Sequence, residues 1–355
     1  MTSWQMSVVA AFTRLAYQRR FTTEAAGLRT LARPKGPSRP PSAILQGYAV
    51  STTRDHGFDL HRVRPHGPDT GVTVIYLHGG AYTSEIVRQH WSLVAFIAAR
   101  TGHEVAVPIY GLAPHHHGLE ALEFVTAVIG AETARGRRCY LAGDSAGGGL
   151  ALLAAQATYH PVGAPTAPTG APTDPADPPA TPGSAPGLVS SSASGSAPSR
   201  VSGSAPGSAG VAPGSAPGGS GGVVGVTAMA PWLDLSISNP EVDAVEPHDP
   251  WLRRPGLRPL AAAWAGEVPL QDPRLSPLFG DLTRLPPLQI LVGTRDITLP
   301  DCRLLRDRLP PSVPLTYHEE PGAVHVYPLL PVPEARPGRQ AIIDHIAATT
   351  TRPPA

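Results

Sequence analysis

The stretch Arg138-Cys-Tyr-Leu-Ala-Gly-Asp-Ser-Ala-Gly-Gly-Gly-Leu-Ala-Leu152 is typical of a short buried strand that passes through a glycine-rich turn into a helix. Its centre, Gly143-Asp-Ser-Ala-Gly147, matches the pattern G-x-S-x-G, in which a strained strand-to-helix turn exposes a serine hydroxyl. Glycines two residues before and after Ser145 leave room for that turn. Because the N-terminus of the following helix lies behind it, negative charge that develops at Ser145 is favoured.

A second match to this pattern, Gly218-Gly-Ser-Gly-Gly222, lies in a run of glycine, serine, proline and alanine with no strand before it, and we attribute it to composition. From about residue 161 to residue 222, nearly every residue is Ala, Pro, Gly, Ser or Thr. Such a segment has few large apolar groups to bury and cannot offset its ordering entropy. We therefore expect residues 161–222 to be a disordered insert.

Length, charge and hydropathy limit the class of protein. A chain of 355 residues allows one large α/β domain, and its net charge of +1 gives no broad basic field, so we expect no nucleic-acid partner. No run approaches the about 18 apolar residues that a membrane span needs. The apolar run from Met6 to Leu15 is short and is interrupted by Arg14, which argues against a signal peptide. We expect a cytoplasmic protein without stable membrane insertion.

Cysteine and histidine give little sign of a metal site. Cys139 and Cys302 are too few for a disulfide framework or a zinc site, and Cys139 lies in a predicted strand as a small buried residue. His115, His116 and His117 are adjacent, but consecutive side chains point in different directions and no cluster of Cys, Asp or Glu accompanies them. We expect loop histidines in solvent, no metal and no organic cofactor.

The N-terminal 32 residues carry a helical pattern, because Trp4, Val8, Phe12, Leu15 and Phe21 recur at roughly helical spacing. This pattern suits a helix that packs on the core through its apolar face, and it equally suits a lid over a substrate pocket.

Apolar runs alternate with helical patterns along the rest of the chain. Edge strands are expected within residues 47–64, and runs typical of buried strands lie at residues 72–77, 104–110, 223–229, 288–292 and 315–319. Predicted helices lie at residues 88–100, 119–133, 146–159, 302–309 and 338–349. This alternation predicts an α/β fold with a mostly parallel central sheet and helices on both faces.

Three candidate catalytic residues follow predicted strands, in the chain order Ser145, Asp296, His325. Because the carboxyl ends of parallel strands share one rim of a sheet, we expect these side chains to meet. A serine hydroxyl needs a base to take its proton, histidine has a pKa near neutral, and an acid holds the imidazole in the required tautomer. Ser145 is therefore the candidate nucleophile, His325 the base and Asp296 the acid.

Other residues compete for two of these roles. Asp301 is a second candidate acid, but it begins a predicted helix, whereas Asp296 directly follows a strand. His248 and His318 are alternative bases. His318 lies within a predicted strand and His248 lies in a segment rich in proline and tryptophan that suits a lid, so His325 is preferred.

Several spaced motifs, taken together and in this order, resemble the hormone-sensitive-lipase-like carboxylesterases of the α/β-hydrolase fold. The resemblance covers about residues 45–345 apart from the insert. It is carried by His78-Gly-Gly80, Tyr110-Gly-Leu-Ala-Pro114, Gly143-Asp-Ser-Ala-Gly-Gly148, Pro231-Trp-Leu-Asp234, Ser276-Pro-Leu278, Gly293-Thr-Arg-Asp296 and His325.

The resemblance implies an α/β-hydrolase catalytic domain formed by residues 41–160 and 223–355, with an N-terminal helical cap over residues 1–40. It implies the triad of Ser145, Asp296 and His325, and an oxyanion loop that begins at His78. The oxyanion donors that it implies are the N–H groups of Gly79, Gly80 and Ala146. The chain departs from the family where Ala81 stands in place of the glycine at the fourth position of the motif that begins at His78, and where Ile109-Tyr-Gly-Leu-Ala-Pro-His115 replaces Asp-Tyr-Arg-Leu-Ala-Pro-Glu.

Three functions fit this sequence. The first is a serine carboxylesterase that hydrolyses short-to-medium acyl esters through an acyl-enzyme on Ser145, with a small-molecule ester as its partner. The second is an amidase or carbamate hydrolase that uses the same triad. The third is a non-catalytic protein that binds small molecules on this fold, which would predict the loss of a triad residue.

Overall fold

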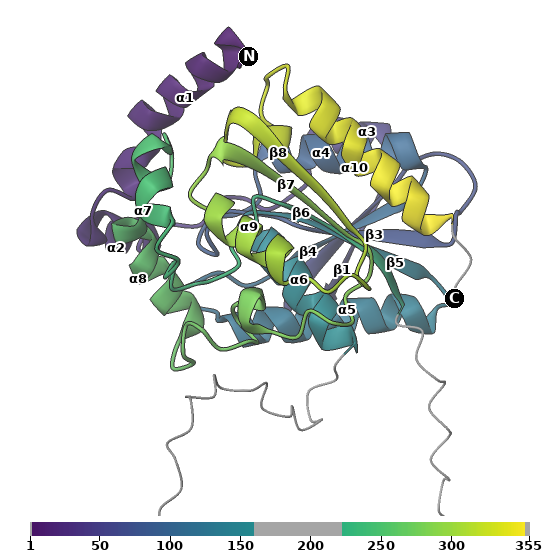
Figure 1. Ribbon diagram of the computed structural model, residues 1–355. Helices are drawn as coiled ribbons and strands as arrows, with labels where there is room; N and C mark the ends of the chain where they lie inside the picture. Colours follow the sequence, from purple (N-terminus) through teal and green to yellow (C-terminus); the bar gives the residue numbers. More distant parts are fainter. Residues whose placement is uncertain (1, 160–221, 352–355) are drawn as a thin grey trace, which may run out of the picture. The chain divides into compact units, whose positions relative to one another are not determined.

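The structure is a computed structural model that describes residues 2–159 and 222–351. Figure 1 shows its central sheet, whose inner strands are short and apolar. The predicted disordered insert, residues 161–222, falls outside these residues except for Gly222. In the described part, eight strands pair in the order β1-β2-β4-β3-β5-β6-β7-β8. The strands are β1 (Ala49–Asp55), β2 (Phe58–Arg64), β3 (Val72–Leu77), β4 (Glu104–Ile109), β5 (Arg138–Asp144), β6 (Val223–Met229), β7 (Leu288–Arg295) and β8 (Leu315–Val324).

The sheet is mostly parallel, which confirms the expected fold class. Only the pairs β1–β2 and β2–β4 are antiparallel, and every other neighbouring pair is parallel. The expected edge strands within residues 47–64 are β1 and β2. Because β3, β5, β6, β7 and β8 run in one direction, the loops at their carboxyl ends lie at the same rim of the sheet.

Helices cover both faces because the parallel strands are apolar on both sides. In β3 every side chain is buried, with Val74 and Tyr76 in one core cluster and Ile75 and Leu77 in the other. The first cluster includes α4 (Arg88–Thr101) and α10 (Ala335–Thr350). The second includes α5 (Gly118–Ala134), α6 (Ala146–Tyr159) and α9 (Leu299–Arg308). Figure 1 shows these two groups on opposite sides of the sheet.

Glycines let α6 pack closely behind the rim. A Cβ atom on Gly147 would lie 2.1 Å from the carbonyl oxygen of Leu77, and one on Gly143 would lie 2.3 Å from the carbonyl oxygen of Gly147. Both distances are far inside van der Waals contact, so only glycine fits at either position. This is the physical basis of the glycine pattern around Ser145.

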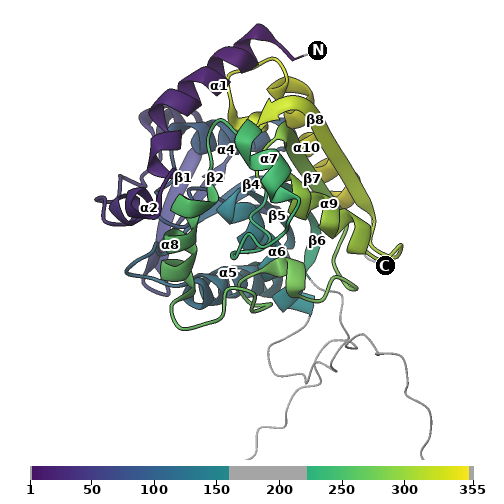
Figure 2. The ribbon, with the colours of Figure 1, turned by 60° about the vertical axis from the view of Figure 1, so that its left-hand side comes forward.

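Two helical segments that are far apart in the sequence pack against each other, and we call them the cap. The N-terminal segment contains α1 (Trp4–Ala16), the 3-10 helix η1 (Gln18–Arg20) and α2 (Glu24–Leu31), and the later segment contains α7 (Val242–Val245), η2 (Glu246–His248) and α8 (Arg254–Ala265). Helices α2 and α8 lie side by side in both views (Figures 1 and 2). The two helices approach closely at Gly27 and Gly256. A Cβ atom on Gly27 would lie only 2.2 Å from the carbonyl oxygen of Gly256, so no side chain fits at Gly27.

Helix α1 is present as predicted, but four of the five apolar residues that predicted it do not pack on the core. Its buried residues are Met6, Ala10 and Thr13. Those four residues are exposed, at 71% for Trp4, 56% for Val8, 58% for Phe12 and 70% for Leu15, whereas the fifth, Phe21, follows η1 and is buried. None of the helices in the described part is long and apolar enough to cross a membrane.

Strand β8 extends further than the sequence predicts. The expected strand ended at Glu319, whereas β8 continues to Val324 after a register shift against β7 between Gly293 and Arg295. The Gly322 N–H donates to Thr294 Oγ1 over 2.7 Å, which ties this extension to its neighbour. The remaining short elements are α3 (Ser42–Gly47), η3 (Pro277–Phe279) and η4 (Tyr327–Leu329).

Candidate active site

Ser145 lies between β5 and α6 in a left-handed backbone conformation, with a φ of +52°. A non-glycine residue adopts that conformation only where its surroundings hold it. Its N–H donates to the carbonyl of Met229 over 2.8 Å, and its own carbonyl accepts from the N–H of Trp232 over 3.0 Å and of Gly149 over 3.1 Å. The turn predicted from the sequence is therefore held by hydrogen bonds to β6, to the loop after β6 and to α6.

The structure brings Ser145, His325 and Asp296 together at the rim. The Ser145 hydroxyl and His325 Nε2 are 2.9 Å apart. On the other side of the ring, His325 Nδ1 lies 2.9 Å and 3.0 Å from the two carboxylate oxygens of Asp296. A carboxylate can only accept, so Nδ1 carries the proton and Nε2 faces the serine as an acceptor. This arrangement can draw the proton from the serine hydroxyl.

The alternative acid and bases form no hydrogen bond with Ser145 or His325 in the described part of the chain. Asp301 accepts a hydrogen bond from Asn239 Nδ2 over 3.0 Å, and no hydrogen bond joins it to His325 in the described part of the chain. His318 lies in β8, and His248 lies in η2, where its carbonyl accepts from Arg295. In the described part of the chain, neither of these histidines forms a hydrogen bond with Ser145, whose hydroxyl is paired with His325.

The environment of His325 favours its protonated form. Burial lowers the pKa of His325, but the negative charge of Asp296 and the hydrogen bond to it outweigh burial, and the net pKa is raised. A further carboxylate, Asp249, contributes in the same direction.

Asp249 is a residue of the site that sequence reasoning missed. It is fully buried, and its oxygens accept from the N–H groups of Trp251, Leu252 and Ile297 over 2.7, 2.9 and 2.9 Å. Burial and the nearby charge of Asp296 raise the pKa of Asp249 to about 6. The only signal in the sequence is a turn-forming Asp-Pro pair in the segment that suits a lid.

The glycine loop after β3 is organised by Asp144. The Gly79 N–H donates to Asp144 Oδ1 over 3.1 Å, and a Cβ atom on Gly79 would lie 2.2 Å from Asp144 Oδ2. This bond uses the single N–H of Gly79, so that residue is not available as an oxyanion donor, contrary to expectation. In the described part of the chain, no group accepts from the N–H of Gly80 or Ala81, and both residues line the cavity beside Ser145.

Asp144 is itself held by two further side chains. The Tyr76 hydroxyl donates to Asp144 Oδ1 over 2.6 Å, and His90 Nε2 lies 3.3 Å from Asp144 Oδ2. Burial alone would raise the pKa of Asp144, but His90 and Tyr76 lower it further than burial raises it. An ionised carboxylate therefore holds the loop.

His78 supports the same loop without a direct role in chemistry. Its Nδ1 donates to the carbonyl of Gly79 over 2.8 Å, and its ring stacks on Tyr110 with centroids 4.6 Å apart. Burial lowers the pKa of His78 to about 4, so the ring is neutral near pH 7.

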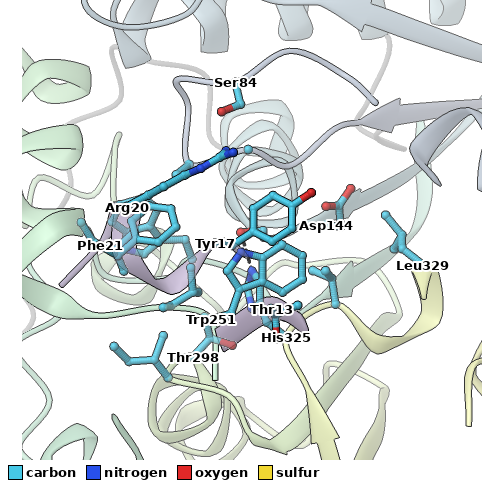
Figure 3. Close-up of a pocket in the computed structure, with 18 of the residues that line it drawn as sticks. Thr13, Tyr17, Arg20, Phe21, Ser84, Asp144, Trp251, Thr298, His325 and Leu329 are labelled. Carbon is cyan, nitrogen blue, oxygen red and sulfur yellow. Dashed lines mark hydrogen bonds between the residues drawn. The ribbon is translucent and has the colours of Figure 1, made fainter. Parts of the chain in front are cut away.

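A cavity of about 400 Å³ opens onto these groups. Ser145, His325 and Asp144 lie at its floor, and apolar side chains from the cap and the rim line the rest, among them Phe21, Trp232, Trp251, Leu257, Ile297 and Leu329. Figure 3 shows Tyr17 and Trp251 of the cap close to His325. The cavity suits an apolar group placed against the serine hydroxyl.

The adjacent histidines lie away from this cavity and have local partners. His116 Nδ1 lies 2.9 Å from Glu120, and His117 Nδ1 donates to the carbonyl of Ala263 over 3.1 Å. Within residues 2–159 and 222–351, no group of three His, Cys, Asp or Glu side chains is arranged to hold a metal ion.

Comparison with known sequences identifies the family to which this chain belongs and proteins that are similar to it. The model of the alpha/beta hydrolase fold family matches residues 74–166 and 208–329, which is more than half of the chain. A predicted acetyl-hydrolase of Mycobacterium tuberculosis, LipR, is 31% identical over 241 residues, an alignment that covers 65% of this chain and 58% of LipR. An acetyl-hydrolase of Streptomyces hygroscopicus is 27% identical over 288 residues, covering 79% of this chain and 75% of that protein. The chain thus spans less than two thirds of LipR.

Solved structures show the same fold. An esterase/lipase from an uncultured bacterium has a TM-score of 0.67 and 20% identity, covering 99% of this chain and 100% of that chain. An esterase from the bacterial hormone-sensitive lipase family has a TM-score of 0.66 and 22% identity, covering 99% of both chains. The chain therefore belongs to the alpha/beta hydrolase fold family, and its resemblance to the hormone-sensitive-lipase-like esterases is confirmed.

Proposed function

We propose that this protein is a serine carboxylesterase that hydrolyses short-to-medium acyl esters. The observation that carries the proposal is the chain of hydrogen bonds from Ser145 Oγ through His325 to Asp296, with distances of 2.9 to 3.0 Å. A base in contact with the hydroxyl and an acid in contact with the base are what a serine nucleophile requires.

The reaction proceeds in two halves. Ser145 Oγ attacks the ester carbonyl carbon while its proton passes to His325 Nε2, and a tetrahedral oxyanion forms. The carbon–oxygen bond to the alcohol then breaks, and the alcohol leaves with the proton from Nε2. Water attacks the acyl-enzyme in the same way, and the carboxylic acid leaves as Ser145 regains its proton. Asp296 keeps Nδ1 protonated and stabilises the imidazolium in both halves.

The oxyanion donors in this proposal are the N–H groups of Gly80, Ala81 and Ala146. Gly80 and Ala81 line the cavity and have positive φ angles of +130° and +52°. Ala146 is the first residue of α6, so its N–H has no acceptor within the helix. Donors fixed in advance around the developing charge are often the largest single contribution to this kind of catalysis.

The cavity and the relatives support acyl esters of modest length. A volume of about 400 Å³ with a mostly apolar lining accommodates a short chain. The two acetyl-hydrolases described above and a protein of Acinetobacter venetianus named esterase, 24% identical over 239 residues, carry names that agree with this substrate class.

The test is hydrolysis of p-nitrophenyl esters from acetyl to dodecanoyl by the wild type and by Ser145→Ala. We expect turnover to peak at short chains and to fall by at least roughly 10³-fold in the variant. A Ser145→Ala protein with the turnover of the wild type would refute the nucleophile. A folded wild type that hydrolyses amides or carbamates but no ester would point to an amidase, and one without turnover of any of these substrates would point to a binding protein.

A further inference from the structure

The outward face of α1 is apolar, although nothing in the fold requires it to be. Trp4, Val8, Phe12 and Leu15 fall within an arc of about 80° around the helix axis, opposite the buried residues. All four side chains are more than half exposed. Figure 2 shows α1 at the margin of the described part. A contiguous exposed apolar face of this kind marks an interaction surface more often than an accident of composition.

The surroundings of this face are basic. Neither α1 nor η1 contains an acidic residue, and Arg14 and Arg19 on these elements are exposed. No ion pair involves either arginine in the described part of the chain. Between residues 2 and 41 the chain has a single acid, Glu24, and seven basic residues, which are Arg14, Arg19, Arg20, Arg29, Arg33, Lys35 and Arg39. Arg14 and Arg19 therefore flank the apolar face, whereas the N-terminal end of α1 lies beside Glu334, which accepts from the N–H and the hydroxyl of Ser3.

The face is continuous with the candidate active site. Phe12 is 58% exposed and also lines the cavity above Ser145, so it lies at the mouth of that cavity. Aromatic contacts lead inward from it, with ring centroids 5.8 Å apart for Phe12 and Tyr17, 5.6 Å for Tyr17 and Trp251, and 5.8 Å for Trp251 and His325. Figure 3 shows the inner part of this path, at Tyr17, Trp251 and His325.

We propose that the outward face of α1, defined by Trp4, Val8, Phe12 and Leu15, docks the protein on an anionic lipid surface. An aromatic and aliphatic face with flanking arginines suits the boundary between headgroups and acyl chains. Docking through Phe12 turns the mouth of the cavity toward the lipid, so an apolar ester could pass from the surface to Ser145 along the aromatic path.

A second copy of this chain is the less favoured occupant. A symmetric pair joined through α1 would place Arg14 and Arg19 beside a partner α1 and η1 that contain no acidic residue, so these charges would gain no ion pair there. Negative lipid headgroups meet the same charges favourably.

The test measures co-sedimentation of Ser145→Ala full-length protein with phosphatidylcholine vesicles that contain or lack phosphatidylglycerol. This background needs no turnover, so the result is independent of the proposed hydrolase activity. We expect binding to the phosphatidylglycerol vesicles that weakens as salt is raised. Adding Trp4→Ser and Val8→Ser should weaken binding by at least roughly tenfold, because two apolar side chains leave the interface. Arg14→Gln should weaken it by roughly fivefold.

The matched control is Leu45→Ser, which removes another exposed apolar side chain, 55% exposed on α3, from outside the face. It should bind vesicles within twofold of its parent. The double variant should keep the far-UV circular dichroism spectrum and the urea unfolding midpoint of its parent, which shows that it folds. The proposal would be overturned if the parent did not bind the phosphatidylglycerol vesicles. It would also be overturned if Leu45→Ser weakened binding as much as the double variant does. A dimer, seen by size-exclusion chromatography, that the double variant abolishes while lipid binding is unchanged would overturn it as well.

Discussion

Asp296→Asn is the substitution that separates the two candidate acids most sharply. It preserves the size of the side chain and removes the negative charge beside His325. The hydrogen bonds from His325 Nδ1 to Asp296 are 2.9 and 3.0 Å long, and both residues are buried. Solvent cannot replace a charge lost at this depth, so the imidazolium that forms during catalysis loses its main stabilising partner.

The size of the effect follows from Coulomb's law. A unit charge about 4 Å from the imidazolium is worth about 4 kcal/mol at an effective dielectric constant of about 20. That energy corresponds to about a 10³-fold loss of kcat. An asparagine amide can also hold the ring in the wrong tautomer, which adds to the loss.

The assay is kcat for p-nitrophenyl butyrate at pH 8, with Asp301→Asn as the matched control. Asp301 lines the same cavity and is buried, but its partner is Asn239. We expect Asp301→Asn to keep kcat within a few-fold of the wild type. The assignment of the acid fails if Asp296→Asn keeps more than a tenth of wild-type kcat, or if Asp301→Asn loses as much as Asp296→Asn.

Two further predictions concern pH. Asp249→Asn removes a charge that raises the pKa of His325, so the acidic limb of the pH profile of kcat/KM should move to lower pH, and an unmoved limb would contradict this role. Burial raises the pKa of Asp301 to about 7, so the folded state holds a proton that the unfolded state releases above about pH 4. The free energy of unfolding, measured with urea, should therefore fall between about pH 4 and pH 7, by at most about 4 kcal/mol from this group. Asp301→Asn should flatten that fall, and an equally steep fall in the variant would exclude Asp301 as its source.

The parts of the fold that the sequence predicted best are those where sterics leave little choice. Gly143 and Gly147 have no room for a Cβ atom, so the positions of these two glycines in the sequence predict the turn at Ser145. Buried parallel strands such as β3 need apolar side chains on both faces, and they stand out as continuous apolar runs. The rim position of Ser145, Asp296 and His325 follows once those strands are placed.

Features set by contacts between distant residues could not be predicted. The direction of the Gly79 N–H depends on Asp144, which is 65 residues away in the sequence, and a glycine pattern does not say which amide faces the cavity. Asp249 is distinguished only by the three N–H groups that surround it in the folded chain. Periodicity located α1 but did not identify its buried face, because the buried residues Met6, Ala10 and Thr13 include only one large apolar side chain, fewer than the exposed face carries.

Asp249 links the cap to the loop that carries the candidate acid, Asp296. One of its oxygens accepts from Trp251, whose ring meets His325 edge-on at an angle of 85°, and the other accepts from Ile297, the residue after Asp296. A shift of the cap at Trp251 would therefore strain the loop that carries the acid. The aromatic path connects this same point to Phe12 on α1. The mouth of the cavity and the loop that carries Asp296 are therefore joined by one series of packed side chains, in which Asp249 contacts both segments.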